Sequence, residues 1–243
     1  MVLKRGDRGV LVKNLQMDLK TLGYYKGVVD GVFGPMTEEA VRQFQTDKQI
    51  KRDGIAGPVT LSLIKQEIEH KKRMPAKKIF IDAGHGGKDP GALGSKSKEK
   101  DITLDVALKL RDELLKKGYR VMLSREKDEY VSLAERSKKA NDFGADLVLS
   151  LHCNAATNKE AAGTETLYKT EASKKIAEKI QAALVKALGT KDRGVVYRDN
   201  LYILNAVKMP AVLVEMAFIS NEAEEEILLT KQGTIAKTLA KVL

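Results

Sequence analysis

The hydrophobic periodicity of this chain changes at Pro75, and that change constrains the fold more than any other feature. Before Pro75, apolar residues recur at the spacing of amphipathic helices. From Lys77 onward, short apolar runs of strand length alternate with helical patterns. This alternation predicts an α/β domain with a mostly parallel, twisted sheet and helices on both faces. We therefore expect a small all-α three-helix module at residues 1–67, a basic linker at 68–77 and an α/β domain at 78–243.

An internal repeat organises the first segment. Asp30-Gly-Val-Phe-Gly-Pro-Met-Thr37 returns 23 residues later as Asp53-Gly-Ile-Ala-Gly-Pro-Val-Thr60. Asp-Gly pairs favour turns, and the following Gly-Pro-x-Thr suits a helix start with Thr37 and Thr60 as N-caps. The segment holds no cluster of reactive side chains, so we expect it to bind rather than to catalyse.

The second segment carries the elements of the predicted sheet. Apolar runs predict strands at 79–81, 121–123, 147–151, 201–204 and 211–214. Helical patterns lie at 106–114, 133–140, 176–188, 222–229 and 235–243.

Two of the three histidines in the chain follow predicted strands. His85 comes after Ile79–Ile81 in a glycine-rich loop, and His152 follows Leu147–Leu151. Glycines allow the sharp turns and close approaches that a binding loop needs. Ligands of α/β sheets bind at the carboxyl ends of the strands. The two imidazoles therefore indicate a metal site.

Glu99 is the expected third ligand, because it lies between His85 and the next predicted helix. Two histidines and one glutamate with an open fourth position make a catalytic zinc arrangement. An equally supported alternative is that Glu99 only complements the positive end of a helix.

Glu215 and the residues after His152 complete the chemical candidates. Glu215 ends the apolar run 211–214, where a carboxylate serves as a general base or forms a buried ion pair. Cys153 should face away from His152, because neighbouring strand side chains point to opposite faces. Asn154 is a weaker candidate for substrate orientation, with a turn role as the alternative.

Charge and composition bound the partners. The net charge is +10, and five basic residues between 71 and 78 supply half of it. A solvated linker or attraction to a polyanion explains this excess, either nucleic acid or an anionic wall polymer. The absence of tryptophan argues against a base-stacking surface. We expect no membrane helix and no signal peptide, because no long apolar run is present. The single cysteine permits no intrachain disulfide.

Two family resemblances cover most of the chain. The first segment resembles the peptidoglycan-binding module of many cell-wall hydrolases through Leu22-Gly-Tyr24, Phe44-Gln45 and both copies of the repeat. The second segment carries Ile81-Asp-Ala-Gly-His-Gly-Gly-Lys-Asp-Pro-Gly-Ala92, Ala134-Glu-Arg136 and Pro210-Ala-Val-Leu-Val-Glu-Met-Ala-Phe-Ile-Ser-Asn221. It also carries Glu99-Lys-Asp101, Leu123-Ser-Arg125, Arg193-Gly194 and 145–155. Through these segments, residues 78–243 resemble the zinc-dependent N-acetylmuramoyl-L-alanine amidases of the type 3 family.

The resemblance implies a function and a site. It implies one zinc ion per chain on His85, Glu99 and His152, with Glu215 as the catalytic glutamate. The implied substrate is the amide between N-acetylmuramic acid and L-alanine of peptidoglycan. Peptidoglycan is then the partner, together with anionic wall polymers; we expect neither specific nucleic-acid binding nor membrane insertion. Asn154 is the weaker substrate-binding candidate.

Some features depart from the family or leave the role open. Ala83, Cys153 and Met216-Ala217 differ from its usual residues, without removing a ligand. An enzyme without a signal peptide needs a lesion to reach the wall. We expect a phage endolysin released with a holin, and a bacterial autolysin freed by mother-cell lysis is the alternative. Rival functions are an inactive wall-binding protein and a basic nucleic-acid-binding protein.

Overall fold

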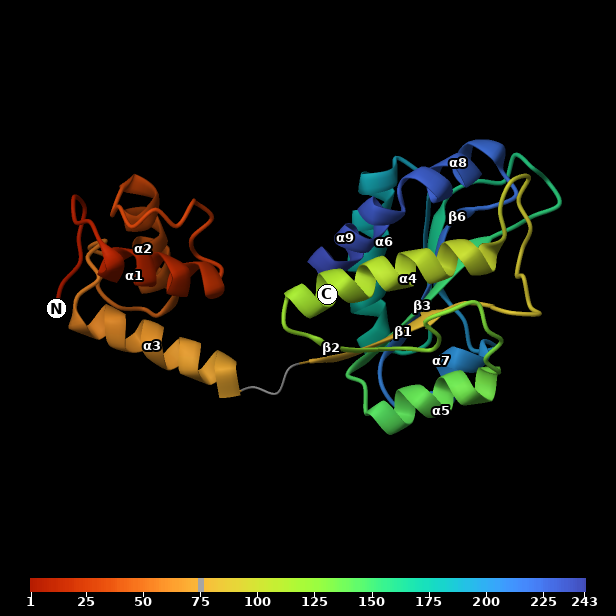
Figure 1. Cartoon of the computed structure of the whole chain (residues 1–243), viewed down its shortest axis with the longest axis horizontal. Coiled ribbons are helices and arrows are strands. Elements are labelled where there is room, and N and C mark those ends of the chain that lie inside the picture. The colour runs from red at the N-terminus through yellow and green to blue at the C-terminus, as the bar shows by residue number, and fades with distance from the viewer. Residues whose placement is uncertain (74–76) are drawn as a thin grey trace. The chain divides into compact units, whose positions relative to one another are not determined.

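The computed structural model describes residues 1–73 and 77–243, with side chains at 1–69 and 77–243. The chain forms two compact units, Met1–Pro75 and Ala76–Leu243 (Figure 1). The side chain of His70 and the basic side chains at 71–73 of the expected linker lie outside the described residues.

Three helices make up the described secondary structure of the first unit, as the sequence predicted. They are α1 (Val10–Thr21), α2 (Pro35–Asp47) and α3 (Pro58–Arg73). Their buried core includes Leu15, Leu19, Phe44 and Ile64. Ile68 is also buried against this core, so α3 continues beyond 67. Residues 68–73, expected in the linker, are therefore helical.

The first copy of the repeat builds a buried polar network around Gln16. The Gln16 amide nitrogen donates to Asp30 Oδ1 at 2.9 Å and to Thr37 Oγ1 at 3.0 Å. Its amide oxygen accepts from the Gly31 backbone N–H at 2.8 Å. One side chain thus fixes the Asp-Gly turn against the next helix, since a buried polar group is stable only when it is paired.

The second copy repeats this network with Gln45. Its amide nitrogen donates to Asp53 Oδ1 at 2.9 Å and to Thr60 Oγ1 at 3.2 Å. The Gly54 backbone N–H donates to its amide oxygen at 2.9 Å. Each glutamine lies outside the repeated motif, 14 residues before Asp30 and 8 residues before Asp53.

The prediction that Thr37 and Thr60 cap helices was wrong. α2 begins at Pro35, with Gly34 as its N-cap and no side-chain capping bond. Proline suits this first position because its missing N–H would have no helical partner. α3 likewise begins at its proline. Both threonines lie inside the first turn, where the glutamines bind their hydroxyls.

The second unit contains a six-stranded sheet, as the predicted fold class required. Its strands are β1 (Lys78–Ala83), β2 (Arg120–Leu123), β3 (Leu147–Asn154), β4 (Thr164–Tyr168), β5 (Asp192–Tyr197) and β6 (Ala211–Phe218). They lie in the order β2-β1-β3-β6-β4-β5. β2, β1, β3 and β6 are parallel, while β4 is antiparallel to β6 and parallel to β5. The carboxyl ends of the first four strands therefore share an edge with the beginnings of β4 and β5.

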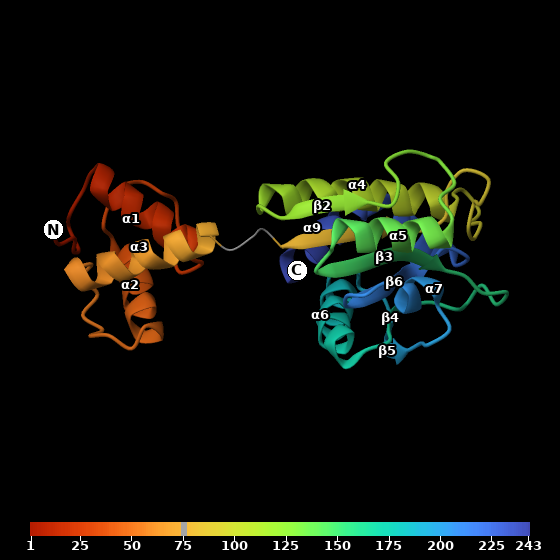
Figure 2. The same ribbon diagram turned by 90° about the horizontal axis from the view of Figure 1, so that it is seen from below.

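Helices cover both faces of this sheet, as predicted. They are α4 (Glu99–Lys116), α5 (Leu133–Phe143), α6 (Glu171–Leu188), α7 (Tyr202–Ala206), α8 (Glu222–Thr230) and α9 (Gln232–Val242). α4, α6 and α9 pack on one face, and α5 and α7 on the other (Figures 1 and 2). Within the described ranges, no helix is both long and apolar enough to cross a membrane.

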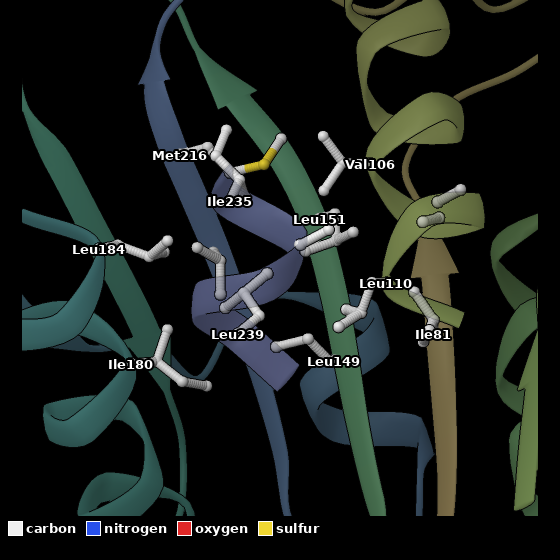
Figure 3. Packing of buried hydrophobic residues seen from close by; sticks show 14 of the residues in the cluster. Ile81, Val106, Leu110, Leu149, Leu151, Ile180, Leu184, Met216, Ile235 and Leu239 are labelled. Atoms are coloured by element: carbon white, nitrogen blue, oxygen red, sulfur yellow. The ribbon is translucent and has the colours of Figure 1, made fainter. Parts of the chain in front are cut away.

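Alternating strand residues feed two separate cores. Ile81, Leu149 and Leu151 point toward α4 and α9 in the larger core (Figure 3). Phe80 and Val148 belong to the smaller core beneath α5 and α7. Since strand side chains alternate between faces, the residues two and four positions after Phe80 and after Val148 also point to the α5 face. This alternation decides which side chains meet at the carboxyl ends of the strands.

Three elements differ from the sequence prediction. The apolar run 201–204 was expected as a strand, but it forms the N-cap and first residues of helix α7, where Ile203 and Leu204 are buried in the smaller core. Periodicity alone cannot separate strand from helix in so short a run. β4 and β5 were not predicted, because their sequences are largely polar and β5 is an exposed edge strand.

Candidate metal and catalytic site

His85 lies where β1 ends and the chain turns sharply. Its φ is 60°, a left-handed conformation that is uncommon for a residue other than glycine. A Cβ added to Gly84 would lie 2.5 Å from Cε1 of His152, so this position requires glycine. The close approach sets the two imidazole rings edge to face, with centroids 5.0 Å apart.

Two buried arginines hold this turn in place. Arg136 donates to Asp82 Oδ1 at 2.8 Å and to the His85 carbonyl oxygen at 2.6 Å. Arg125 donates to the Gly84 carbonyl oxygen at 3.0 Å. Carbonyl groups inside a turn have no strand partner, and charge-assisted hydrogen bonds supply one. The sequence matched both arginines to family segments without assigning them these contacts.

Glu99, the first residue of α4, lies between the two histidines. Its carboxylate is 3.1 Å from His85 Nε2 and 2.9 Å from His152 Nδ1. The same carboxylate accepts backbone N–H bonds from Ala92 at 2.8 Å and Cys153 at 2.9 Å. The side chain is nearly fully buried. Glu99 therefore does more than complement the helix dipole, because it is fixed against both imidazoles.

These three residues form a group that could hold a metal ion. One ligand atom from each of His85, Glu99 and His152 lies within 4.8 Å of the other two. Ligand atoms around a tetrahedral zinc ion are roughly 3.3 Å apart, and the Glu99 carboxylate lies at a similar distance, 3.1 Å and 2.9 Å, from the two imidazole nitrogens. Nitrogen and carboxylate oxygen are also the donors that zinc accepts.

Asp89 supports the same arrangement from outside. Its carboxylate lies 2.9 Å from His85 Nδ1, which directs Nε2 toward Glu99. Its other oxygen accepts from the Gly91 backbone N–H at 3.1 Å. A carboxylate on the far nitrogen of a histidine is the usual support for a metal ligand. Sequence reasoning missed Asp89, although it lies in the same glycine-rich loop.

The protonation of these side chains follows from their contacts. Burial lowers the pKa of His85, but hydrogen bonds and charge from Glu99 and Asp89 outweigh it and raise that pKa to about 9. Burial raises the pKa of Glu99, yet bonds from His152 and His85 hold it far below its ordinary value. A metal ion that takes the imidazole nitrogens must therefore displace protons.

Glu215 of β6 joins the cluster through the sheet register. It lies opposite His152 of β3 and opposite Glu165 of β4, so the three side chains share the α5 face. Among the described residues, its buried Oε2 has no hydrogen-bond partner, and no lysine or arginine forms an ion pair with it. Burial first, and then Glu99 and Glu165, raise its pKa to about 7, although His152 opposes the shift. The lysine or arginine ion pair that the sequence left open is therefore not formed by any side chain that the structure describes.

The two residues after His152 have structural contacts. Cys153 is buried in the larger core, on the face opposite His152, as the strand alternation predicted. Asn154 Oδ1 accepts the Ala155 backbone N–H at 2.9 Å, which is a turn contact. Substrate contact by Asn154 stays a prediction.

A small cavity lies beside the histidines. It encloses about 80 Å³ and reaches from His85 and His152 to Tyr130 and Leu133. Tyr130 and Leu133 are half-exposed, so they form an open wall next to the cluster.

Comparison with known families matches both units. Residues 79–243 match the family model described as N-acetylmuramoyl-L-alanine amidase. Residues 8–64 match the model of a putative peptidoglycan binding domain.

Individual relatives point the same way. The chain is 45% identical over 150 residues to N-acetylmuramoyl-L-alanine amidase LytC of Bacillus subtilis, which covers 60% of this chain and 30% of LytC. It is 38% identical over 160 residues to the endolysin of Bacillus phage SPP1, covering 63% of this chain and 59% of the endolysin. The chain thus spans less than two thirds of these two relatives.

A solved structure extends the likeness to the fold. The catalytic domain of CwlV, an N-acetylmuramoyl-L-alanine amidase from Bacillus (Paenibacillus) polymyxa, superposes with a TM-score of 0.66 at 36% identity. The match covers 68% of this chain and 95% of that domain. The chain therefore belongs to the N-acetylmuramoyl-L-alanine amidase family.

Proposed function

We propose that the second unit hydrolyses the amide bond between the lactyl group of N-acetylmuramic acid and L-alanine in peptidoglycan. One observation carries the proposal. His85, Glu99 and His152 converge at the sheet edge where the unpaired carboxylate of Glu215 lies on the same face. Three metal-binding groups beside a carboxylate of raised pKa form the constellation that amide hydrolysis needs.

His85, Glu99 and His152 would hold one zinc ion per chain. When bound, the ion supplies Lewis-acid polarisation of the scissile carbonyl and activation of water. Glu99 contributes the one negative charge of the set and is locked by two backbone N–H groups. Asp89 and Arg136 orient His85 through its Nδ1 atom and its carbonyl oxygen.

Glu215 would move the proton. As a carboxylate it accepts a proton from the attacking water, and as an acid it returns that proton to the leaving amine of alanine. A general base works best when its pKa lies near the operating pH. The pKa of about 7 allows Glu215 to occupy both forms in turn.

Digestion of purified peptidoglycan tests this activity. The full chain loaded with zinc should release new alanine amino groups without new reducing sugars. New reducing ends would identify a glycosidase instead. A digest that yields neither alanine amino groups nor reducing ends would contradict the proposal.

We propose that the first unit binds the wall without cleaving it. It has its own hydrophobic core, and its buried polar groups serve the two repeat networks. Residues 1–75 should pellet with purified walls. The net charge of +10 would add attraction to anionic wall polymers, so pelleting of the full chain should weaken as salt rises. Binding only by residues 77–243 would contradict this division.

The proposed biological role is that of a phage endolysin that reaches the wall after a holin opens the membrane. The chain is similar both to a phage endolysin and to an amidase of a bacterium, so a bacterial autolysin freed by mother-cell lysis is the second candidate. A holin gene beside the coding sequence would support the phage role. Expression in a sporulating mother cell would support the bacterial one.

A further inference from the structure

The strand order places five side chains in a row along the edge of the sheet where the parallel strands β2, β1, β3 and β6 end. The loop after β2 carries Tyr130, followed by His85 after β1, His152 on β3, Glu215 on β6 and Arg193 at the start of β5. We propose that this row fixes the direction of the substrate. The muramoyl sugar lies over Tyr130, and the stem peptide runs past Glu215 toward Arg193. This inference rests on the proposed amidase function.

The direction follows from the proton transfer. Glu215 must come within hydrogen-bond reach of the leaving amine. The peptide half of the substrate is attached to that amine, so it lies on the β6 side of the metal-binding group. The acyl half is bonded to the opposite side of the carbonyl carbon. It therefore extends toward β1 and β2, where Tyr130 lies.

Tyr130 has the features of a sugar platform. Tyr130 is 49% exposed and lines the cavity beside His85. The ammonium group of Lys88 lies 4.6 Å from the ring centroid, which holds the ring from one side. Rigid aromatic side chains supply contact area at low entropic cost, and a sugar ring offers an apolar face to match.

The wall that carries Tyr130 is fixed before substrate arrives. Asp128 accepts the Gly87 backbone N–H at 2.7 Å, and Lys100 donates to both Asp128 at 2.7 Å and the Gly87 carbonyl at 3.0 Å. A Cβ added to Gly86 would lie 2.3 Å from the carbonyl oxygen of Glu129. The two loops are therefore pressed together, so little order has to be imposed on binding.

Arg193 offers a cation at the other end of the row. Its guanidinium lies over the Phe218 ring at 5.0 Å and 3.7 Å from Glu165 Oε1. The side chain is still 34% exposed. Since Glu165 lies opposite Glu215 on the neighbouring strand, Arg193 is about two strands beyond the proposed base. A planar guanidinium binds a carboxylate well, and the stem peptide carries carboxylates beyond its alanine.

Three soluble substrates distinguish recognition of the sugar from recognition of the stem peptide. One is N-acetylmuramoyl-L-alanyl-D-glutamate. The second replaces the sugar by a bare D-lactoyl group, and the third ends in alanine amide and so lacks the acidic residue. Each is given to the zinc-loaded full chain, to Tyr130→Ala and to Arg193→Gln. Arg198→Gln is the matched control, because Arg198 is exposed immediately after β5.

Each of the two substitutions should weaken the binding of a different part of the substrate. Tyr130→Ala should raise KM about tenfold for the two sugar-bearing substrates and leave KM for the lactoyl peptide within twofold. Tyr130→Phe should restore most of the lost affinity. Arg193→Gln should raise KM about tenfold only where the acidic residue is present. Titration with N-acetylmuramic acid gives a readout without turnover, and binding should weaken in Tyr130→Ala but not in Arg193→Gln.

Each other outcome overturns the inference. The reverse pairing, with Tyr130→Ala sensitive to the acidic residue, would mean that the substrate lies in the opposite direction. Equal losses for all three substrates would assign both residues a purely structural role. If the unaltered chain does not cleave the complete substrate, the proposed amidase function itself is wrong. Digestion of purified peptidoglycan by the unaltered chain tests that function separately.

Discussion

Buried polar side chains occur in both units, but they are paired in opposite ways. In the first unit, Gln16 and Gln45 use both ends of their amides on neighbouring turn atoms. In the second unit, Glu99 is shared between two imidazoles, and the described residues give the Glu215 Oε2 atom no partner. A saturated network stabilises a turn, whereas an unsatisfied buried carboxylate costs stability and indicates function.

The comparison also separates two uses of glycine. Gly31 and Gly54 have positive φ values and present backbone N–H groups to a glutamine. Gly84, which is not among the glycines with a positive φ, instead leaves space for the cluster: a Cβ there would lie 2.5 Å from Cε1 of His152. Turn formation and access to a site are thus distinct demands that look alike in sequence.

Removing a proposed metal ligand should have the largest effect. In His85→Ala, two donors are left, so zinc should be lost and peptidoglycan hydrolysis should fall by about 10,000-fold or more. Elemental analysis and the release of alanine amino groups measure the two quantities together. Full zinc occupancy in this variant would show that His85 is not a ligand.

Glu215→Gln should lower kcat by roughly 100- to 10,000-fold while zinc content stays the same. The unaltered enzyme needs the ionised carboxylate, so its rate should fall as pH decreases through about 7, the raised pKa of this group. That limb of the profile should vanish in the variant. Near-normal hydrolysis together with a lower melting temperature would instead identify a structural role for Glu215.

Asp89→Asn should weaken zinc binding by roughly 10- to 100-fold, because Asp89 orients His85 without binding the ion itself. Competition with a chelator measures this affinity. The matched control is Asp112→Asn, an exposed aspartate on α4, and its affinity should be unchanged. Equal zinc affinity in Asp89→Asn and Asp112→Asn would show that Asp89 does not support His85 as a ligand.

Gln16→Ala tests the other side of the comparison. It should destabilise the first unit by about 1–3 kcal/mol, because Asp30, Gly31 and Thr37 lose buried partners. Hydrolysis of soluble substrates should not change. Gln43→Ala, at an exposed position of α2, should be nearly neutral. Denaturant unfolding of residues 1–75 gives the difference, and equal stability of the two variants would contradict a stabilising network.

The sequence alone determined the layout of the chain and most of its elements. Local periodicity distinguished the helical segment from the α/β segment, since an apolar stripe is a property of each element by itself. It also brought His85 and His152 together, because parallel strands end at one edge. Local pattern failed for α7, whose residues pack into the smaller core, and for the polar strands β4 and β5, which form by pairing with neighbouring strands.

Only the tertiary structure decided how the cluster is held. The turn at His85 is contacted from other segments of the chain by Arg125 and Arg136. Asp89 reaches His85 through a bend of its own loop, which residue spacing does not reveal. The strand order set Glu215 beside His152, and the register set both on the α5 face. Register and burial are long-range properties: they fix which charges lie close together in a dry environment, and so which carboxylate has a pKa near neutrality.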